Sequence, residues 1–592
     1  MLKRFFISML GTMAGLWISI FLLFFGGVMV AVMALGKNAG DSNVKVSRHS
    51  VLVLDLSGNV EERFQPGSFM SFIQKGENNA PTLEELLTAV RGAASDDKIE
   101  GMYIKCGGAA MGMAAREELL EAINDYKESG KWIFAYSDTY AQGDYMIATT
   151  ADSIMLNPVG AVDIHGIGGM TPFFTGLLDK LGVKMQIIKV GTYKSAVEPY
   201  VLKEMSEPAR RQMQQYIDSV WSFVSGTIAE NRDIPVGEID HMAANFVGQS
   251  PAETFVEKNL VTSLAYERTV DDAIRRQLGL DEDEDINYIS TSQYVESADI
   301  KNILGGSGKK HIALLYAVGD IVDSGNDGIV GPDMVSQICE LADDDHVKGM
   351  VLRVNSPGGS AFASEQIWEA LQYFKSKDKP LYVSMGDYAA SGGYYISCGA
   401  DSIFADLTTL TGSIGVFGMI PDLSGLVTDK LGVTFTTVES NPNAAGISLT
   451  TPMTPEQHAA MQKGVDRIYE LFTGRVAAGR HMDIDSVKAI AEGRVWVGAD
   501  AIRLGLVDRI GSLHTAVEAM ADALDMDGSD VVAYPKTEDK IWMTILRNSG
   551  EFSDMKLGEM PYDAETARML DIVKNLRTMN PMQARMEAIE IK

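Results

Sequence analysis

The hydrophobic pattern divides the chain into an apolar N-terminal run and two long stretches in which apolar segments alternate with helical ones. Between Arg4 and Lys37 there is no charged residue, and most positions are apolar. Further along, apolar runs open at His49 and at His311, and each is followed by a helical pattern, a second apolar run and a second helical pattern. Alternating strands and helices are typical of a parallel sheet covered by helices. The pattern therefore predicts an α/β fold.

The two long stretches are copies of one unit. Ala-Asp-Ser-Ile occurs at 151–154 and again at 400–403, and further similar residues follow in nearly the same register. Self-similarity at a constant spacing indicates a duplicated structural unit. Each copy also contains a long amphipathic segment that starts with Ser or Thr near a proline, which predicts helices over 206–232 and 454–480. We assign these helices to packing and assembly.

The duplication predicts where the domains begin and end. A short stretch between the copies is rich in glycine and ends in lysines, as interdomain connections often do. The final segment is polar and rich in methionine and has no counterpart in the first copy, so its role stays open. The expected segments are a cytoplasmic tip with a membrane anchor, a linker, a first repeat, a second linker, a second repeat and a tail, at 1–36, 37–48, 49–303, 304–310, 311–535 and 536–592.

The N-terminal apolar run has the length of a membrane anchor. About 20 apolar residues span a bilayer, whereas the apolar region of a cleaved signal peptide has about 7–15 residues. The length therefore favours an uncleaved transmembrane helix over a signal peptide. Lys3 and Arg4 precede it and, by the positive-inside tendency, lie in the cytoplasm, so we expect both repeats on the extracytoplasmic side.

Charge and cysteine content argue against several classes of function. The formal net charge is −29, whereas a protein that binds nucleic acid is expected to present a basic face. Three cysteines without metal-ligand spacing indicate neither a disulfide framework nor a zinc site, and we interpret them as buried thiols. We expect no nucleic acid partner, no metal and no cofactor.

Ser391 is the candidate nucleophile. It lies between an apolar run that ends at Met385 and a helical segment that starts at Tyr394, and its neighbours are alanine and glycine. A serine on a tight turn between strand and helix exposes its hydroxyl, and small neighbours let a substrate carbonyl approach. The segment does not match the Gly-x-Ser-x-Gly pattern, and serine beside glycine also marks ordinary turns.

The candidate base is a lysine. No histidine lies in the segments of the second copy that surround Ser391, so a Ser-His-Asp triad is unsupported. A desolvated lysine can replace histidine because burial disfavours the charged amine and lowers its pKa. Lys194 in the first copy has no acidic residue closer than Glu198 in the sequence. A lysine is ordinarily interpreted as a solvated surface residue. The comparison of the two copies favours a functional role for Lys194 instead.

The two copies have complementary losses. Ser391 in the second copy corresponds to Gln142 in the first, and Lys194 in the first copy corresponds approximately to Ala444 in the second. Each copy lacks what the other retains. We therefore expect one Ser/Lys pair built from both copies.

A glycine-rich segment after the second apolar run is the candidate oxyanion site. Consecutive glycines can aim backbone N–H groups at a developing negative charge, and we name Gly358 or Gly359, together with Gly392, as donors. A simple Pro-Gly turn is the alternative. In the first copy the corresponding segment starts at Cys106 and reads Cys-Gly-Gly-Ala-Ala-Met-Gly, which retains the motif only in part.

Four motifs surround these residues: Gly-Thr-Tyr-Lys-Ser-Ala-Val-Glu-Pro, Asn-Ser-Pro-Gly-Gly, Ala-Ser-Gly-Gly-Tyr and Leu-Thr-Gly-Ser-Ile-Gly-Val-Phe-Gly, at 191–199, 355–359, 390–394 and 410–418. Together they resemble the signal peptide peptidase A family in its long, duplicated bacterial form. The resemblance implies two tandem ClpP/crotonase-like repeats with helix-covered, mostly parallel sheets, preceded by one transmembrane helix. It also implies a serine endopeptidase with Ser391 as nucleophile, Lys194 as general base and Ser413 holding the lysine amine.

The resemblance further implies the substrate and the setting. The substrates would be signal peptides left in the membrane after preprotein cleavage, and other apolar peptides. The expected partners are the lipid bilayer, through the N-terminal helix, and further copies of the chain in a homotetramer. The expected location is the bacterial inner membrane, with the repeats on the periplasmic or extracytoplasmic side.

Two other classes of function are weighed against this one. A membrane-tethered scaffold ring without turnover is disfavoured because both Ser391 and Lys194 are retained in the expected copies. A crotonase-like enzyme that transfers acyl groups from coenzyme A esters would use similar glycine-rich loops, and an extracytoplasmic location disfavours it.

Overall fold

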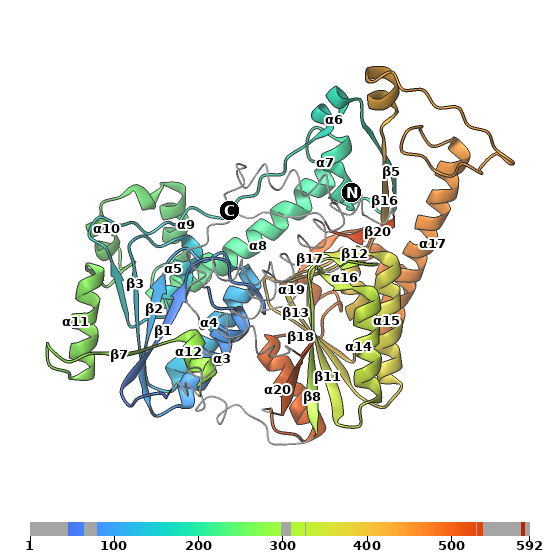
Figure 1. Ribbon diagram of the computed structural model, residues 1–592. Helices are drawn as coiled ribbons and strands as arrows, with labels where there is room; N and C mark the ends of the chain where they lie inside the picture. The colour runs from blue at the N-terminus through green and yellow to red at the C-terminus, as the bar shows by residue number, and fades with distance from the viewer. Residues whose placement is uncertain are drawn as a thin grey trace, which may run out of the picture.

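The computed structural model describes residues 45–63, 80–297, 310–325, 327–528, 530–536 and 582–586, and shows two α/β repeats packed together (Figure 1). The predicted α/β class is confirmed. The expected anchor, most of the linker at 37–48 and all but the last residue of the linker at 304–310 lie outside the described residues. Within the described ranges, none of the helices combines the length and hydropathy that a membrane span needs.

The sheet of the first repeat is entirely parallel, with strand order β6-β4-β3-β2-β1-β7. Its strands are β1 (Ser50–Leu56), β2 (Ile99–Cys106), β3 (Trp132–Ser137), β4 (Ser153–Leu156), β6 (Ser263–Leu264) and β7 (Asn287–Ser290). Apolar side chains fill both faces of this sheet, as expected for a parallel sheet between two helical layers.

The sheet of the second repeat has the order β17-β15-β13-β11-β8-β19, with β14 and β18 branching from β13. Within it, the β15–β17 pair is antiparallel and the other pairs are parallel. Its strands are β8 (His311–Val318), β11 (Val347–Ser356), β13 (Leu381–Ala390), β14 (Ser402–Ala405), β15 (Leu410–Gly412), β17 (Val495–Val497), β18 (Arg509–Ile510) and β19 (Val531–Tyr534). The prediction of mostly parallel sheets is confirmed for the two main sheets.

A third sheet joins the two repeats, in the order β10-β9-β12-β20-β16-β5. Its strands are β5 (Lys184–Lys189), β9 (Ile321–Val322), β10 (Ile329–Val330), β12 (Gly358–Ser360), β16 (Phe417–Asp422) and β20 (Met582–Arg585). Strand β5 belongs to the first repeat and pairs antiparallel with β16 of the second, and the two strands run side by side away from the main sheets (Figure 1). Because β5 pairs with β16, the segment that follows β5 lies against the second repeat.

Helices cover both main sheets. Those of the first repeat are α3 (Leu83–Ser95), α4 (Met113–Glu128), α5 (Gln142–Ala148), α6 (Thr175–Leu181), α7 (Glu198–Val201), α8 (Glu207–Arg232), α9 (Val236–Ala244), α10 (Ala252–Glu257), α11 (Glu267–Leu278) and α12 (Thr291–Glu296). Those of the second are α14 (Gly331–Asp343), α15 (Ala361–Lys375), α16 (Gly392–Ser397), α17 (Pro455–Gly479), α18 (Ile484–Ile490), α19 (Gly498–Ala501) and α20 (Leu513–Leu524). In the second repeat α14 and α15 cover one face and α20 the other (Figure 1).

The two long helices predicted from the sequence are confirmed as α8 and α17. Ser206 and Thr454 are their N-caps, and each hydroxyl accepts a hydrogen bond from a backbone N–H of the first turn, which satisfies an otherwise unpaired donor. Val224 of α8 and Phe472 of α17 are buried in the cores of the first and second repeat. Both helices serve packing, as expected.

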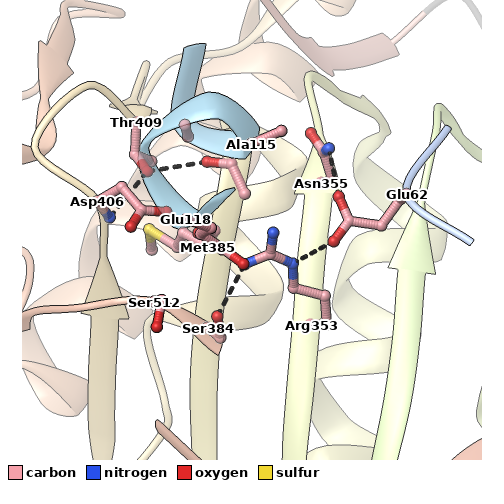
Figure 2. A network of polar contacts seen from close by, with 12 residues as sticks. Glu62, Ala115, Glu118, Arg353, Asn355, Ser384, Met385, Asp406, Thr409 and Ser512 are labelled. Atoms are coloured by element: carbon pink, nitrogen blue, oxygen red, sulfur yellow. Dashed lines mark hydrogen bonds and ion pairs between the residues drawn. The ribbon is translucent and has the colours of Figure 1, made fainter. Parts of the chain in front are cut away.

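A buried ionic network ties the first repeat to β11 (Figure 2). Arg353 on β11 is fully buried and forms ion pairs of 2.6 Å with Glu62 and with Glu118 of the first repeat. Asn355 Nδ2 donates to the other oxygen of Glu62 at 2.9 Å. Because an unpaired charge in such a place costs several kcal/mol, this network fixes the first repeat against the strand that leads to the glycine-rich segment.

Candidate active site

Ser391 lies on a strained turn between β13 and α16. Its φ is 56°, in the left-handed region that residues other than glycine adopt rarely. Its N–H donates to Gly412 O at 2.8 Å, and a Cβ on Gly393 would stand 2.6 Å from Ser356 O, so only glycine fits there. Backbone strain of this kind is concentrated at functional sites. The predicted strand–turn–helix setting is confirmed.

Lys194 reaches Ser391 from the first repeat. After β5, Val190 N donates to Val416 O at 3.1 Å and Tyr193 N donates to Glu492 O at 3.0 Å, so the segment that carries Lys194 is bonded to the second repeat. A Cβ on Gly493 would stand 2.7 Å from Lys194 Cβ. This close backbone approach is open only to glycine, and it lets the lysine stem pass into the interior.

The three residues expected to act together meet within one chain. Lys194 Nζ lies 2.8 Å from Ser391 Oγ, 3.1 Å from Ser413 Oγ and 3.2 Å from Ser413 O. Ser391 has no exposed surface, and Lys194 and Ser413 are 1% and 2% exposed. The amine therefore lies between the two serine hydroxyls in a fully buried site.

Burial controls the charge of this amine. It lowers the pKa of Lys194 well below the ordinary 10.5, because an ammonium loses its hydration there. The oxygen atoms that contact Nζ belong to hydroxyls and a carbonyl and carry no formal charge. A neutral amine in contact with a serine hydroxyl can accept its proton, which is what a general base has to do.

The glycine-rich segment lies beside Ser391. It leaves β11 at Ser356 and forms β12, and a Cβ on Gly358 would stand 2.6 Å from Gly392 N. Gly358 and Gly392 are therefore in contact, as expected for the two sides of an oxyanion site. Gly359 pairs with Ile321 of β9 on one side of β12 and with β20 on the other.

The first repeat shows what the same loop binds. Gly108 follows the end of β2 as Gly358 follows the end of β11, and both have a positive φ, of 81° and 100°. The N–H groups of Gly108 and Ala109 donate to Asp144 Oδ2 at 2.8 and 3.2 Å. In this fold the loop therefore holds a negatively charged oxygen. The residue at the position of Asp144 in the second repeat is Gly393, which has no side chain to fill the loop.

Gln142, which stands at the position of Ser391 in the first repeat, has a structural contact. Its side-chain oxygen accepts from the N–H groups of His165 and Gly166 at 3.0 Å, and its amide donates to Gly166 O at 3.0 Å. The sequence comparison identified this loss but missed Asp144, two residues further on. The signal was present, since a carboxylate there corresponds to a glycine in the other copy.

Two segments of the chain, 125–281 and 373–527, match the family model of peptidase family S49, and residues 321–404 also match that of the Clp proteases. The chain belongs to peptidase family S49. Protease 4 of Haemophilus influenzae and Protease 4 of Salmonella typhi are each 34% identical to this S49 peptidase, over 84% of this chain and 82% of theirs. A putative signal peptide peptidase SppA of Enterococcus faecium is 36% identical over 39% of this chain and 68% of its own.

The predicted family and the predicted class of enzyme are confirmed. The chain is a serine peptidase with a ClpP-like α/β fold and two S49 repeats. The first matched segment contains Lys194, and the second contains Ser391 and Ser413. The family match therefore covers both sides of the site, and the structure brings them together.

Proposed function

We propose that this S49 peptidase is a membrane-anchored endopeptidase that uses Ser391 and Lys194 as a catalytic dyad and degrades signal peptides after their release from preproteins. The observation that carries the proposal is the 2.8 Å contact between Lys194 Nζ and Ser391 Oγ inside a buried site. The name of the Enterococcus relative supports the substrate class. The apolar run before Lys37 supports the anchor and an extracytoplasmic location.

In the proposed mechanism neutral Lys194 takes the hydroxyl proton while Ser391 Oγ attacks the peptide carbonyl. Backbone N–H groups of the glycine-rich segment and of Gly392 stabilise the oxyanion. Lys194 then gives its proton to the leaving amine. A water molecule activated by the same amine hydrolyses the acyl-enzyme and restores the hydroxyl.

Ser413 positions the amine. Its hydroxyl and its carbonyl both lie within hydrogen-bonding distance of Lys194 Nζ, so two acceptors from one residue set the direction of the third contact, to Ser391. The backbone of Ser413 is itself held, because its N–H donates to Arg494 O at 2.7 Å. Strict positioning matters here because proton transfer requires hydrogen-bonding contact.

The strands beside the dyad suit an extended peptide. Strands β12 and β16 each pair antiparallel with β20, which lies between them in the third sheet, so their facing edges offer main-chain hydrogen bonds to an extended strand without regard to its sequence. Such recognition suits signal peptides, which share apolar character rather than a fixed sequence. We include in the proposal a homotetramer that encloses the sites, on the basis of the family resemblance.

The test is hydrolysis of an internally quenched peptide of leucine and alanine by the full chain in detergent. Ser391→Ala and Lys194→Met are each expected to abolish turnover. Lys184→Met is the matched control, because Lys184 is an exposed lysine at the far end of β5. Full activity in either dyad variant would refute the assignment, and a wild-type chain without turnover would favour the scaffold.

A further inference from the structure

A glutamine of helix α8 bonds the segment that carries Lys194 to a strand of the second repeat. Gln212 is 7% exposed. Its side-chain amide donates to Tyr193 O at 3.2 Å and to Ser195 Oγ at 3.0 Å, and these two residues flank Lys194 in the sequence. Its side-chain oxygen accepts from Val495 N of β17 at 3.3 Å. A single carboxamide therefore holds both sides of the lysine and joins them to β17.

The strand at the other end of this link also holds Ser413. Val495 directly follows Arg494, whose carbonyl accepts from Ser413 N at 2.7 Å. The hydroxyl and the carbonyl of Ser413 are in turn the two oxygens that contact Lys194 Nζ besides the one of the nucleophile. Gln212 thus connects the stem of the lysine to the backbone that positions its amine.

The second repeat lacks this glutamine. In both long helices, α8 and α17, a glutamine donates to the aspartate four residues further on, and this shared contact fixes their alignment. The pairs are Gln214 with Asp218 at 2.7 Å and Gln462 with Asp466 at 2.8 Å. In this register Gln212 corresponds to Ala460, which is exposed. The copy without the lysine is therefore also without the glutamine that holds it, whereas the glutamine of the shared contact is kept in both copies.

A neutral side chain suits this position. A glutamine offers donors and an acceptor without a charge, whereas a carboxylate close to the amine would raise its pKa. The charged groups of this region have partners of their own. Glu198 accepts from Ser206 N and Oγ at 3.0 and 2.7 Å, and Arg494 and Asp500 both bond the side chain of Gln215, at 3.0 and 2.6 Å. The link to the lysine segment is made by the carboxamide of Gln212.

We propose that Gln212 is a positioning residue of this peptidase, which holds the stem of Lys194 so that Nζ stays in contact with Ser391 and Ser413. The proposal rests on the proposed function, since it concerns the base of the same dyad. Gln212 acts through the two residues that flank the lysine, so its removal should affect the rate of the chemical step rather than the binding of the peptide.

The test compares Gln212→Met with Gln214→Met, a matched change at an exposed position of the same helix, in the full chain in detergent. Methionine fits beside Ala209 and Met213, which line a small pocket with Gln212, but it makes none of the three hydrogen bonds. Because a displacement of about 1 Å can cost about 100-fold in rate, Gln212→Met should lower kcat for the quenched peptide about 10- to 100-fold at an unchanged KM. Gln214→Met should keep the wild-type kcat.

Two results of this comparison would overturn the positioning role. One is an equal kcat in the Gln212→Met and Gln214→Met chains. The other is a raised KM with an unchanged kcat in Gln212→Met, which would place Gln212 in contact with the peptide.

The pH profile separates positioning from a loss of stability. A released lysine stem lets water reach Nζ, which moves the pKa of Lys194 back toward 10.5. The fall of kcat/KM on the acid side should therefore shift to higher pH in Gln212→Met. Gln212→Glu, which keeps the shape of the side chain, should shift it in the same direction because it adds a carboxylate near the amine. A fall at the wild-type pH in either variant, with activity lowered equally at every pH, would show a structural role only and overturn the proposal.

The two proposals can fail separately. Turnover that depends on Ser391 and Lys194 but is unaffected by Gln212→Met would overturn the positioning role and leave the proposed function intact. A wild-type chain without turnover, or turnover that survives Ser391→Ala, would overturn the proposed function itself.

Discussion

Protonation of Lys194 should control the activity of this peptidase as a function of pH. An amine with the ordinary lysine pKa of 10.5 is neutral in only about one molecule in 3,000 at pH 7, a deficit of about 5 kcal/mol. In the structure burial lowers the pKa of Lys194 well below that value, so the neutral base is present where an ordinary lysine would be protonated. Activity should therefore fall on the acid side of the lowered pKa and reach a plateau above it.

The assay is kcat/KM for the quenched leucine–alanine peptide, measured at each pH unit from 5 to 10 at constant ionic strength. A single protonated base predicts a tenfold loss for each unit below the lowered pKa. A profile that still rises tenfold per unit up to pH 10 would show an ordinary lysine and refute the argument from burial. A profile that is flat throughout would show that no lysine is titrated.

The same shift affects the stability of the fold. Between the lowered pKa and 10.5 the unfolded chain carries a proton on Lys194 that the folded chain does not, so stability rises with pH across this window. The free energy of unfolding rises by about 1.4 kcal/mol per pH unit within this window. Burial of Lys194 therefore destabilises the fold most at pH values below the lowered pKa. Lys194→Met should lose this pH dependence, as measured by urea unfolding at several pH values. If the free energy of unfolding depended on pH equally in the wild type and in Lys194→Met, the lowered pKa of Lys194 would be contradicted.

Three further substitutions follow from the described contacts. Ser413→Gly keeps the backbone conformation, because glycine tolerates a φ of 48°, and should lower kcat about tenfold with little change in KM, since one of the contacts that position the base is lost; an unchanged kcat would remove Ser413 from the mechanism. Asp144→Ala leaves the buried Arg116 without its ion pair of 3.1 Å and should cost about 3–5 kcal/mol, seen as a lower thermal midpoint. Arg353→Met leaves Glu118 buried without its cation and should lower the midpoint by a similar energy; unchanged midpoints would show that these pairs contribute little.

The strands and the candidate dyad were predictable because their signals are local or repeated. Apolar runs of strand length mark β2 and β11 without any knowledge of their neighbours. Ser391 and Lys194 are weak candidates singly, but the two copies could be compared position by position, and each had lost the partner that the other kept. The comparison of the copies therefore indicated that Ser391 and Lys194 act together, which the sequence of one copy alone could not indicate.

The contacts between distant segments were not predictable. Arg353 lies in an apolar run, and its partners Glu62 and Glu118 come from the other repeat, so the pattern of β11 alone gave no sign of a buried ion pair. Strand β20 has only four residues and pairs with strands far away in the sequence. Short strands carry too little periodicity to be recognised, and their pairing depends on the assembled sheet.

The same loop has a fixed acceptor in the first repeat and a proposed oxyanion role in the second. In the first repeat the carboxylate of Asp144 fills the loop permanently and is itself paired with Arg116, so the backbone N–H groups contribute to stability and are closed to a substrate. In the second repeat the corresponding residue is Gly393, which has no side chain to accept from the loop, and the Ala584 carbonyl oxygen lies next to Gly358 instead. An oxyanion site has to hold donors without a fixed acceptor, which costs stability that the rest of the fold must supply. The first repeat, which also carries Lys194, has buried contacts that stabilise the fold, among them the ion pairs of Arg116 with Asp144 and of Glu118 with Arg353.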